Sequence, residues 1–513
     1  MLPSPANWSV QIHGYTTLTV STISQLLEAN RAVDLVRHPG SFIISATRAS
    51  TRETYIITSA YGAINYFYAV QNQQFYHAST VAEILEQSRI PFRWNISALV
   101  DLFSLDHLTG NASPHRDVHR TPAGSVLHFV NSSLQTTILS WSDLHPETGP
   151  ADPDRAADLF AAETARFAGP DPVLSASAGF DSRLLLAALL HAGLRPRLLV
   201  AGSPESTDRI VTEQIARHYN LPITPVELTH RDFPSVANTV TRATNGTKTA
   251  YHWHTYLYPH LGHLSLSDRL LVGANGEFAR TYYLDRGILS RAFDFLPAKP
   301  LALQFWKRKI LISRVFREGF KHLKPELADA LANSHVAEPE KIWSLNPDRS
   351  LLRHFDQTYL SERVRHVITN GLTLYSLSAM PITPFLSTGW VSEIDRLPRY
   401  WKFGSRWHRH AIARLQPSLL NFLEQGTTGP MRRTPKPFYW RRKKMPTVNL
   451  YDRDGLFRDN DFLSLLPAHA DALSEIADPD WIRQVVAEHR STEKETRFIA
   501  NFLPLAVWRS NLS

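Results

Sequence analysis

The stretch Ser-Ala-Gly-Phe-Asp-Ser-Arg at 177–183 constrains the fold more than any other feature of the sequence. It lies between an apolar run at 172–174, which predicts a strand, and a run of helical periodicity at 184–190. A tight turn of small residues between a strand and a helix directs backbone N–H groups and the positive end of the helix dipole toward one point. The stretch therefore predicts a binding site for an anion such as phosphate.

An acidic residue inside this turn, Asp181, would repel a bare phosphate, so we expect a cation to bridge the two. Mg²⁺ fits that role because it prefers one or two carboxylates together with phosphate oxygens. The pattern is neither a Walker loop nor a GxGxxG fingerprint, and by itself it is also compatible with an ordinary strand-to-helix turn. A phosphate site with a bridging Mg²⁺ indicates that the ligand is a nucleotide. The residues expected to bind it are Ser175, Ser177, Ala178, Gly179, Phe180, Asp181 and Ser182.

The residues that follow alternate between strand-like and helix-like runs. Strands are expected at 194–201, 223–228 and 270–272, and a helix is expected at 207–219. Alternation at this spacing predicts a parallel sheet, whose ligands bind beyond the carboxyl ends of the strands.

The strand expected at 270–272 runs directly into Gly-Ala-Asn-Gly-Glu. Because the carboxyl ends of parallel strands share one edge of a sheet, this segment is expected near the first turn. Gly273, Asn275 and Gly276 then join the nucleotide-binding residues. Glu277 is expected to meet Asp181 over one metal ion, so these two acids are the predicted metal ligands and catalytic residues.

Together these motifs resemble the asparagine synthetase family of the PP-loop ATP-pyrophosphatase superfamily. The first is similar to the SGGxDS pyrophosphate loop, with Ala178 in place of a glycine, and GANGE is similar to the family's second acidic motif, with Glu277 in place of aspartate. Pro-Phe-Leu at 384–386 and the Leu-Pro before Lys402 are similar to a third segment. HASTVAEIL and RTPAGSVLHF, in the N-terminal third, resemble the glutaminase-type domain that precedes the synthetase domain in this family.

The resemblance implies an α/β protein with two domains. Residues 1–144 correspond to a β-rich, Ntn-hydrolase-like sandwich, and 155–513 correspond to a parallel-sheet synthetase domain that becomes mainly helical toward its C-terminal part. A linker rich in proline and acidic residues, at 145–154, separates them. ATP and Mg²⁺ are the implied cofactors.

The sequence contains no cysteine. A working glutaminase of this family exposes an N-terminal cysteine whose thiolate attacks glutamine, whereas this chain begins Met1-Leu2-Pro3 and offers Ser4 as the alternative nucleophile after processing. We therefore expect the glutaminase-like domain to be inactive and to act as a platform. The lack of cysteine also excludes disulfides and favours the cytoplasm, and no run approaches the roughly 20 apolar residues of a membrane span.

A synthetase that releases no ammonia from glutamine must take its amine from elsewhere. β-Lactam and carbapenam synthetases and lasso-peptide cyclases are similar proteins whose substrates supply their own amine. The resemblance then implies adenylation of a carboxylate, with release of pyrophosphate, followed by macrolactam closure in a lasso-type peptide or another specialised metabolite. The implied partners are a carboxylate-bearing small molecule or a precursor peptide, together with a biosynthetic protease or leader-binding protein. Ammonia-dependent amidation of a carboxylate such as a sugar acid, and a non-catalytic scaffold, remain alternatives.

The sequence leaves the identity of the catalytic base undecided. Ala274 stands where β-lactam synthetases carry a tyrosine, and no glutamate stands at 380–382, so the tyrosine–glutamate pair of those enzymes is missing from its expected positions. His252 and His254 are candidate bases, because an unperturbed imidazole titrates near pH 6.5. A metal site that also includes His260 and His263, or a simple packing role, is the alternative.

A basic run with interleaved aromatic residues follows at 432–444. In the family a loop lysine neutralises charge in this region, so Arg432, Arg433 and Lys436 are candidates for that role, with a solvated surface as the alternative. The net charge of +8 also raises the possibility of nucleic-acid binding. The charge is spread over a long chain without a recognised nucleic-acid module, so we expect no nucleic-acid partner.

Overall fold

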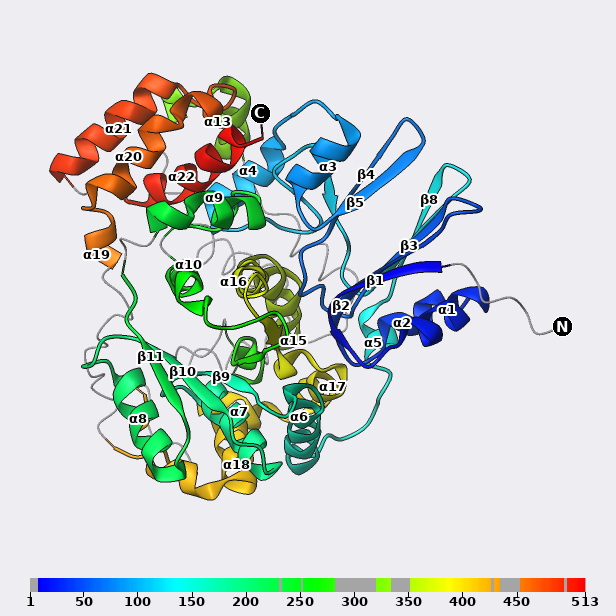
Figure 1. The fold of residues 1–513 in the computed structure, drawn as a ribbon, viewed down its shortest axis with the longest axis vertical. Helices are drawn as coiled ribbons and strands as arrows, with labels where there is room; N and C mark the ends of the chain where they lie inside the picture. Colours follow the sequence, from blue (N-terminus) through cyan, green and yellow to red (C-terminus); the bar gives the residue numbers. More distant parts are fainter. Residues whose placement is uncertain are drawn as a thin grey trace.

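The computed structural model describes residues 8–229, 233–250, 252–280, 282, 320–333, 351–425, 429–433, 453–492 and 496–512. It is an α/β protein with antiparallel sheets in its N-terminal part, a parallel five-stranded sheet, and a helical C-terminal part. Figure 1 shows the parallel sheet at the bottom, the antiparallel sheets at the upper right and the C-terminal helices at the upper left. No helix in the described ranges is long and apolar enough to cross a membrane.

The N-terminal part contains two antiparallel sheets. Their strands are β1 (Trp8–Thr16), β2 (Gly40–Arg48), β3 (Glu53–Thr58), β4 (Phe67–Gln71), β5 (Gln74–Ala78), β6 (His119–Arg120), β7 (Ser125–Val130) and β8 (Ser133–Ile138). The larger sheet has the order β1-β2-β3-β7-β8 and the smaller one β5-β4-β6. The two sheets pack against each other where Phe75 stacks on Phe129, with ring centroids 5.2 Å apart. The predicted β-rich character of this segment is confirmed.

Five helices accompany these sheets. They are α1 (Val20–Glu28), α2 (Ala32–Val36), α3 (Val81–Ser88), α4 (Ile96–Leu105) and α5 (Trp141–Leu144). Local sequence explains where several of them begin, because the side chains of Thr19, Thr80 and Asn95 accept hydrogen bonds from the first turns of α1, α3 and α4. Apolar residues of α1 and α2, such as Ile23 and Leu35, cover one face of the larger sheet.

The second half of the chain is organised around the parallel sheet. Its strands are β9 (Val173–Ala176), β10 (Arg197–Ala201), β11 (Ile223–Val226), β12 (Arg269–Val272) and β13 (Met380–Ile382), in the order β11-β10-β9-β12-β13. Every neighbouring pair is parallel, which confirms the predicted sheet. Parallel strands that are buried on both faces consist of short continuous apolar runs, and such runs were the basis of the strand predictions.

Helices pack around the parallel sheet. Helices α6 (Pro153–Ala168), α7 (Phe180–His191) and α8 (Thr207–Tyr219) contact its strands, and α17 (Thr388–Arg396) and α18 (Arg406–Leu415) pack against α6. The helix predicted at 207–219 has these bounds. Helix α6 begins at Pro153, inside the predicted linker at 145–154, because Asp152 caps it by accepting the N–H of Asp154 at 2.9 Å and proline suits the first helical position.

The other helices of the described ranges form the upper-left part of Figure 1 and its centre. They are α9 (Phe233–Ala243), α10 (Trp253–Leu257), α13 (Pro325–Ala332), α15 (Leu351–Thr358), α16 (Thr369–Tyr375), α19 (Arg453–Leu456), α20 (Asn460–Ala468), α21 (Pro479–Thr492) and α22 (Thr496–Ser510). A π-helix, Tyr359–Ile368, joins α15 to α16. Phe103 of α4 stacks on Phe502 of α22 at 4.6 Å, so the N- and C-terminal parts of the chain share one hydrophobic core.

Short 3₁₀ turns also occur in the described ranges. They are Tyr258–Leu261, Gly276–Arg280, Phe320–His322, Pro384–Leu386, Arg399–Trp401, Phe403–Ser405, Pro417–Asn421 and Ala470–Leu473.

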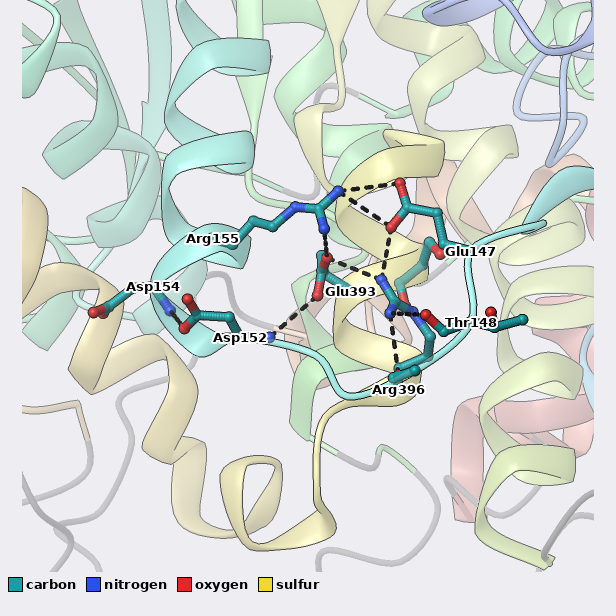
Figure 2. Close-up of polar contacts among 9 residues, drawn as sticks. Glu147, Thr148, Asp152, Asp154, Arg155, Glu393 and Arg396 are labelled. Carbon is teal, nitrogen blue, oxygen red and sulfur yellow. Dashed lines mark hydrogen bonds and ion pairs between the residues drawn. The ribbon is translucent and has the colours of Figure 1, made fainter.

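The segment between the N-terminal sheets and α6 is fastened by a ring of alternating charges (Figure 2). Glu393 of α17 binds Arg155 at 3.1 Å and Arg396 at 2.9 Å. Glu147 of the linker binds the same two arginines, at 3.2 Å and 2.7 Å. The Glu393 side chain is 1% exposed and that of Glu147 is 42% exposed, so the two acids differ in how much water screens them.

We expect Glu393→Gln to destabilise the protein much more than Glu147→Gln. Removing the buried acid leaves Arg155 and Arg396 with only the exposed Glu147 as a shared partner, and because Arg155 is half exposed the loss should be about 2 kcal/mol in the free energy of unfolding. The exposed acid should contribute less than about 1 kcal/mol. Urea unfolding of both variants measures the difference, and equal effects would show that the burial of Glu393 does not matter.

Candidate functional site

The two predicted motifs lie at the point where the order of the sheet reverses. From β9 the chain moves to β10 and β11 on one side and then crosses to β12 and β13 on the other. Loops that leave neighbouring strands in opposite directions open a crevice at the carboxyl edge, where parallel sheets bind ligands. The loops that follow β9 and β12 are 177–179 and 273–275, so the sheet places both motifs at this crevice.

The first turn is held by its own serine side chains. Ser182 Oγ accepts the N–H of Ser177 at 3.1 Å and donates to the Ser177 carbonyl at 3.0 Å, while the N–H of Gly179 donates to Ser177 Oγ at 3.2 Å. Helix α7 begins at Phe180, with Gly179 as its N-cap residue. The N–H groups of Phe180, Asp181 and Ser182 have no acceptor within the helix, so they are the donors that an anion would use.

The N–H of Ala178 already has an acidic partner that the sequence did not indicate. It donates to Asp208 Oδ1, in the first turn of α8, at 2.8 Å. Burial raises the pKa of Asp208, although this N–H and the charge of Arg183 act against that rise. The neighbouring Arg183 is buried: it is 1% exposed and donates to the carbonyls of Ala178, at 3.0 Å, and Leu423, at 2.7 Å.

Asp181 lies against the second motif and between two basic side chains. A Cβ on Gly276 would collide with its carboxylate, and one on Gly273 would lie 2.9 Å from the N–H of Ser182, so only glycine allows the two loops to approach this closely. Arg280 Nη2 lies 2.5 Å from Asp181 Oδ2, and His408 Nε2 lies 2.9 Å from Asp181 Oδ1. Burial by itself would raise the pKa of Asp181, but Arg280 and His408 outweigh burial and lower it.

Glu277 faces the same arginine from the other side. Arg280 Nη2 lies 3.7 Å from its Oε1, and the Tyr359 hydroxyl donates to its Oε2 at 2.9 Å. Burial and the nearby Glu277 charge raise the pKa of Tyr359 well above its usual value, so the hydroxyl keeps its proton. Tyr359 begins the π-helix, a distortion often found at functional sites.

The predicted metal ligands therefore meet, but an arginine lies between them. A magnesium ion needs carboxylate oxygens that are open to it. Here Asp181 faces Arg280 and His408, and Glu277 faces Arg280 and Tyr359, so the pair as arranged does not fit a magnesium ion. Nowhere in the described part of the chain do three side chains of histidine, aspartate or glutamate gather as a metal centre.

Three further residues predicted to bind nucleotide occupy different settings. Asn275 is fully buried with φ +80°, and neither atom of its side-chain amide has a hydrogen-bond partner among the described residues. It is therefore a candidate ligand contact. Ser175 lies inside β9, between Leu199 of β10 and Val272 of β12. The ring of Phe180 packs under the guanidinium of Arg409 at 4.7 Å.

The candidate bases His252 and His254 form a buried pair of their own. Their Nδ1 atoms lie 2.6 Å apart and the rings stack at 4.5 Å. Burial, with the nearby charge of Lys248, lowers both pKa values well below 6.5, and burial lowers the pKa of Lys248 itself to about 7. Among the described residues neither ring contacts Asp181 or Glu277, so this pair is separate from the turn.

The basic candidates of the C-terminal third are only partly described. Arg432 and Arg433 are exposed, and within the described ranges neither guanidinium contacts the two acids. The carbonyl of Arg432 accepts from Arg409 at 2.8 Å, which fastens this segment beside α18. Lys436 lies outside the described residues.

A cavity of about 810 Å³ lies elsewhere, between the N-terminal sheets and helices α9 and α16. None of the predicted nucleotide-binding residues lines it. Its walls include His13, Asn65, Glu83, Arg242, Thr373 and Met380.

Comparison with known proteins adds no assignment. No protein-family profile matches the chain, and no curated protein matches its sequence.

We expect acid to destabilise the protein in part through His252 and His254. Both pKa values are lowered in the folded state, so below about pH 6.5 the unfolded chain takes up protons that the folded chain cannot. Each such group lowers the free energy of unfolding by about 1.4 kcal/mol per pH unit until its folded pKa is reached. Urea unfolding of the wild type, His254→Asn and the exposed-site control His263→Asn at neutral and mildly acidic pH measures this dependence. A slope in His254→Asn as steep as that of the wild type would contradict the expectation.

Proposed function

We propose that the chain is an ATP-dependent amide synthetase that activates a carboxylate by adenylation. The observation that carries this proposal is the meeting of the loops after β9 and β12 at the switch point of the parallel sheet. A helix N-terminus whose first N–H groups have no acceptor within the helix and a pair of acids linked by an arginine lie there together. A polyphosphate is the ligand that this combination of donors and charge fits best.

The reaction has two steps. A carboxylate oxygen of the substrate bonds to the α-phosphorus of ATP while the bond to pyrophosphate breaks, and an amine then attacks the acyl carbon, releasing AMP and losing a proton. The N–H groups of Phe180, Asp181 and Ser182 would stabilise the charge that develops on the leaving pyrophosphate. The internal bonds of Ser177 and Ser182 hold those donors in place before the ligand arrives.

The finer version of the proposal follows the resemblance to the asparagine synthetase family. The N-terminal antiparallel sheets would be a glutaminase-like domain that has lost its activity, which the absence of cysteine supports. The amine would then come from the substrate itself, giving macrolactam closure in a precursor peptide, with a biosynthetic protease or leader-binding protein as partner. Ammonia-dependent amidation shares the first step and differs only in the amine.

A specific observation favours the alternative of a non-catalytic scaffold. The N–H of Ala178 is occupied by Asp208, and Arg280 fills the space between the two acids, so part of the site is satisfied without a ligand. In that case the fold would have kept the turn as a structural element. Nucleotide turnover separates the two possibilities.

The test is the formation of AMP and pyrophosphate from ATP, with a pool of candidate carboxylates and peptides. We expect turnover in the wild type and a loss of about 100-fold or more in Asp181→Asn, because that change disturbs the charges at the leaving group. The matched control is Asp171→Asn, an exposed acid that pairs with Arg197 before β9 and should leave turnover unchanged. A wild type that neither binds nor turns over nucleotide would overturn the proposal and leave the scaffold.

A further inference from the structure

A guanidinium takes the position between the two acids where the sequence predicts a metal. Arg280 ends the 3₁₀ turn Gly276–Arg280, which also carries Glu277, so one turn of backbone presents the arginine and one of the acids to the same side. The arginine reaches Asp181 at 2.5 Å and Glu277 at 3.7 Å. It therefore joins the acids of both loops, as a bridging cation would.

The other neighbours of the two acids hold them in this arrangement. His408, which is fully buried on α18, lies behind Asp181 at 2.9 Å, and the Gly276 backbone closes off the same oxygen. Tyr359 holds the far oxygen of Glu277 at 2.9 Å. The side chain of Asp181 is 16% exposed and that of Arg280 is 25% exposed, so the ion pair is largely shielded from water.

A divalent ion would have to enter beside a guanidinium and compete with it for the same oxygens. Two like charges in a shielded site repel strongly, and Arg280 keeps its charge at any physiological pH. An arginine can also do what the ion would do for a phosphate, because its planar fork binds phosphate oxygens directly.

We propose that Arg280 is the resident cation of the Asp181–Glu277 pair, that it excludes divalent metal from this pair, and that it contacts the phosphate anion itself. The proposal concerns the same site as the proposed function and rests on it only for the identity of the anion. Its chemistry is that of a guanidinium–phosphate contact, in place of a metal bridge.

The experiment measures Mn²⁺ alone, without nucleotide, by electron paramagnetic resonance titration of the full chain. We expect the wild type and Asp181→Asn to bind Mn²⁺ equally weakly. Arg280→Met removes the cation and keeps the length of the stem, so it should bind Mn²⁺ at least about tenfold more tightly than the wild type. Adding Asp181→Asn to that variant should abolish the gain. The matched control is Arg269→Met, at the opposite end of β12, which should leave Mn²⁺ binding unchanged.

Wild-type protein that binds Mn²⁺ about tenfold more tightly than Asp181→Asn would overturn the proposal. That comparison does not depend on Arg280→Met folding, and Arg280→Lys, which keeps a positive charge, should bind Mn²⁺ as weakly as the wild type. Because no nucleotide is present, the titration is independent of turnover. If the enzyme is active and its Mn²⁺ binding depends on Asp181, the proposed role of Arg280 is wrong and the synthetase function stands. If the protein is inactive and shows no such binding, the synthetase function is wrong and the role of Arg280 stands.

Discussion

The parallel pairing of β12 with β9 is the constraint on which the candidate site depends. Leu270 lies opposite Val173 and Val272 opposite Ser175, so the two strands end at the same level and their loops leave from one edge. The glycines of the second loop then allow the backbone to touch Asp181. Without this pairing, residues almost a hundred positions apart would have no reason to meet.

Buried ion pairs fasten the C-terminal half of the chain around that edge. Lys402 binds Asp356 at 2.5 Å, and Arg409 binds Glu424 at 2.6 Å. Arg409 also covers the ring of Phe180 at the start of α7. Since each of these charges is buried with its partner, breaking one pair would leave an uncompensated charge, which is far more costly than the pair itself is stabilising. These pairs therefore stabilise the packing around the turn.

Local patterns in the sequence were enough to place the framework. Short apolar runs gave four of the five strands of the parallel sheet to within a few residues, because buried parallel strands are continuous in hydrophobicity. Strand β13 was missed because Met-Pro-Ile is too short to stand out. The meeting of Asp181 with the second acidic loop could be expected from topology alone, before any side chain was placed.

The partners of those two acids could not be predicted in the same way. His408 and Tyr359 come from α18 and the π-helix, far along the chain, and nothing in their local sequence marks them as neighbours of the turn. The contact of Arg280 with Glu277 could have been predicted, because an arginine three residues after a glutamate on a helical turn faces the same side. His252 and His254 fit the pattern of a base, but burial, which the sequence does not reveal, lowers their pKa values and keeps them uncharged. Among the described residues, their rings also contact neither of the two acids.

The most direct measurement is a crystal structure of the full chain with α,β-methylene-ATP. The triphosphate should lie at the N-terminus of α7, with its oxygens on the N–H groups of residues 180–182 and within reach of Arg280. A nucleotide bound elsewhere on the molecule would contradict the assignment of this edge of the sheet as the phosphate site. Crystals that take up no nucleotide at saturating concentration would contradict it equally.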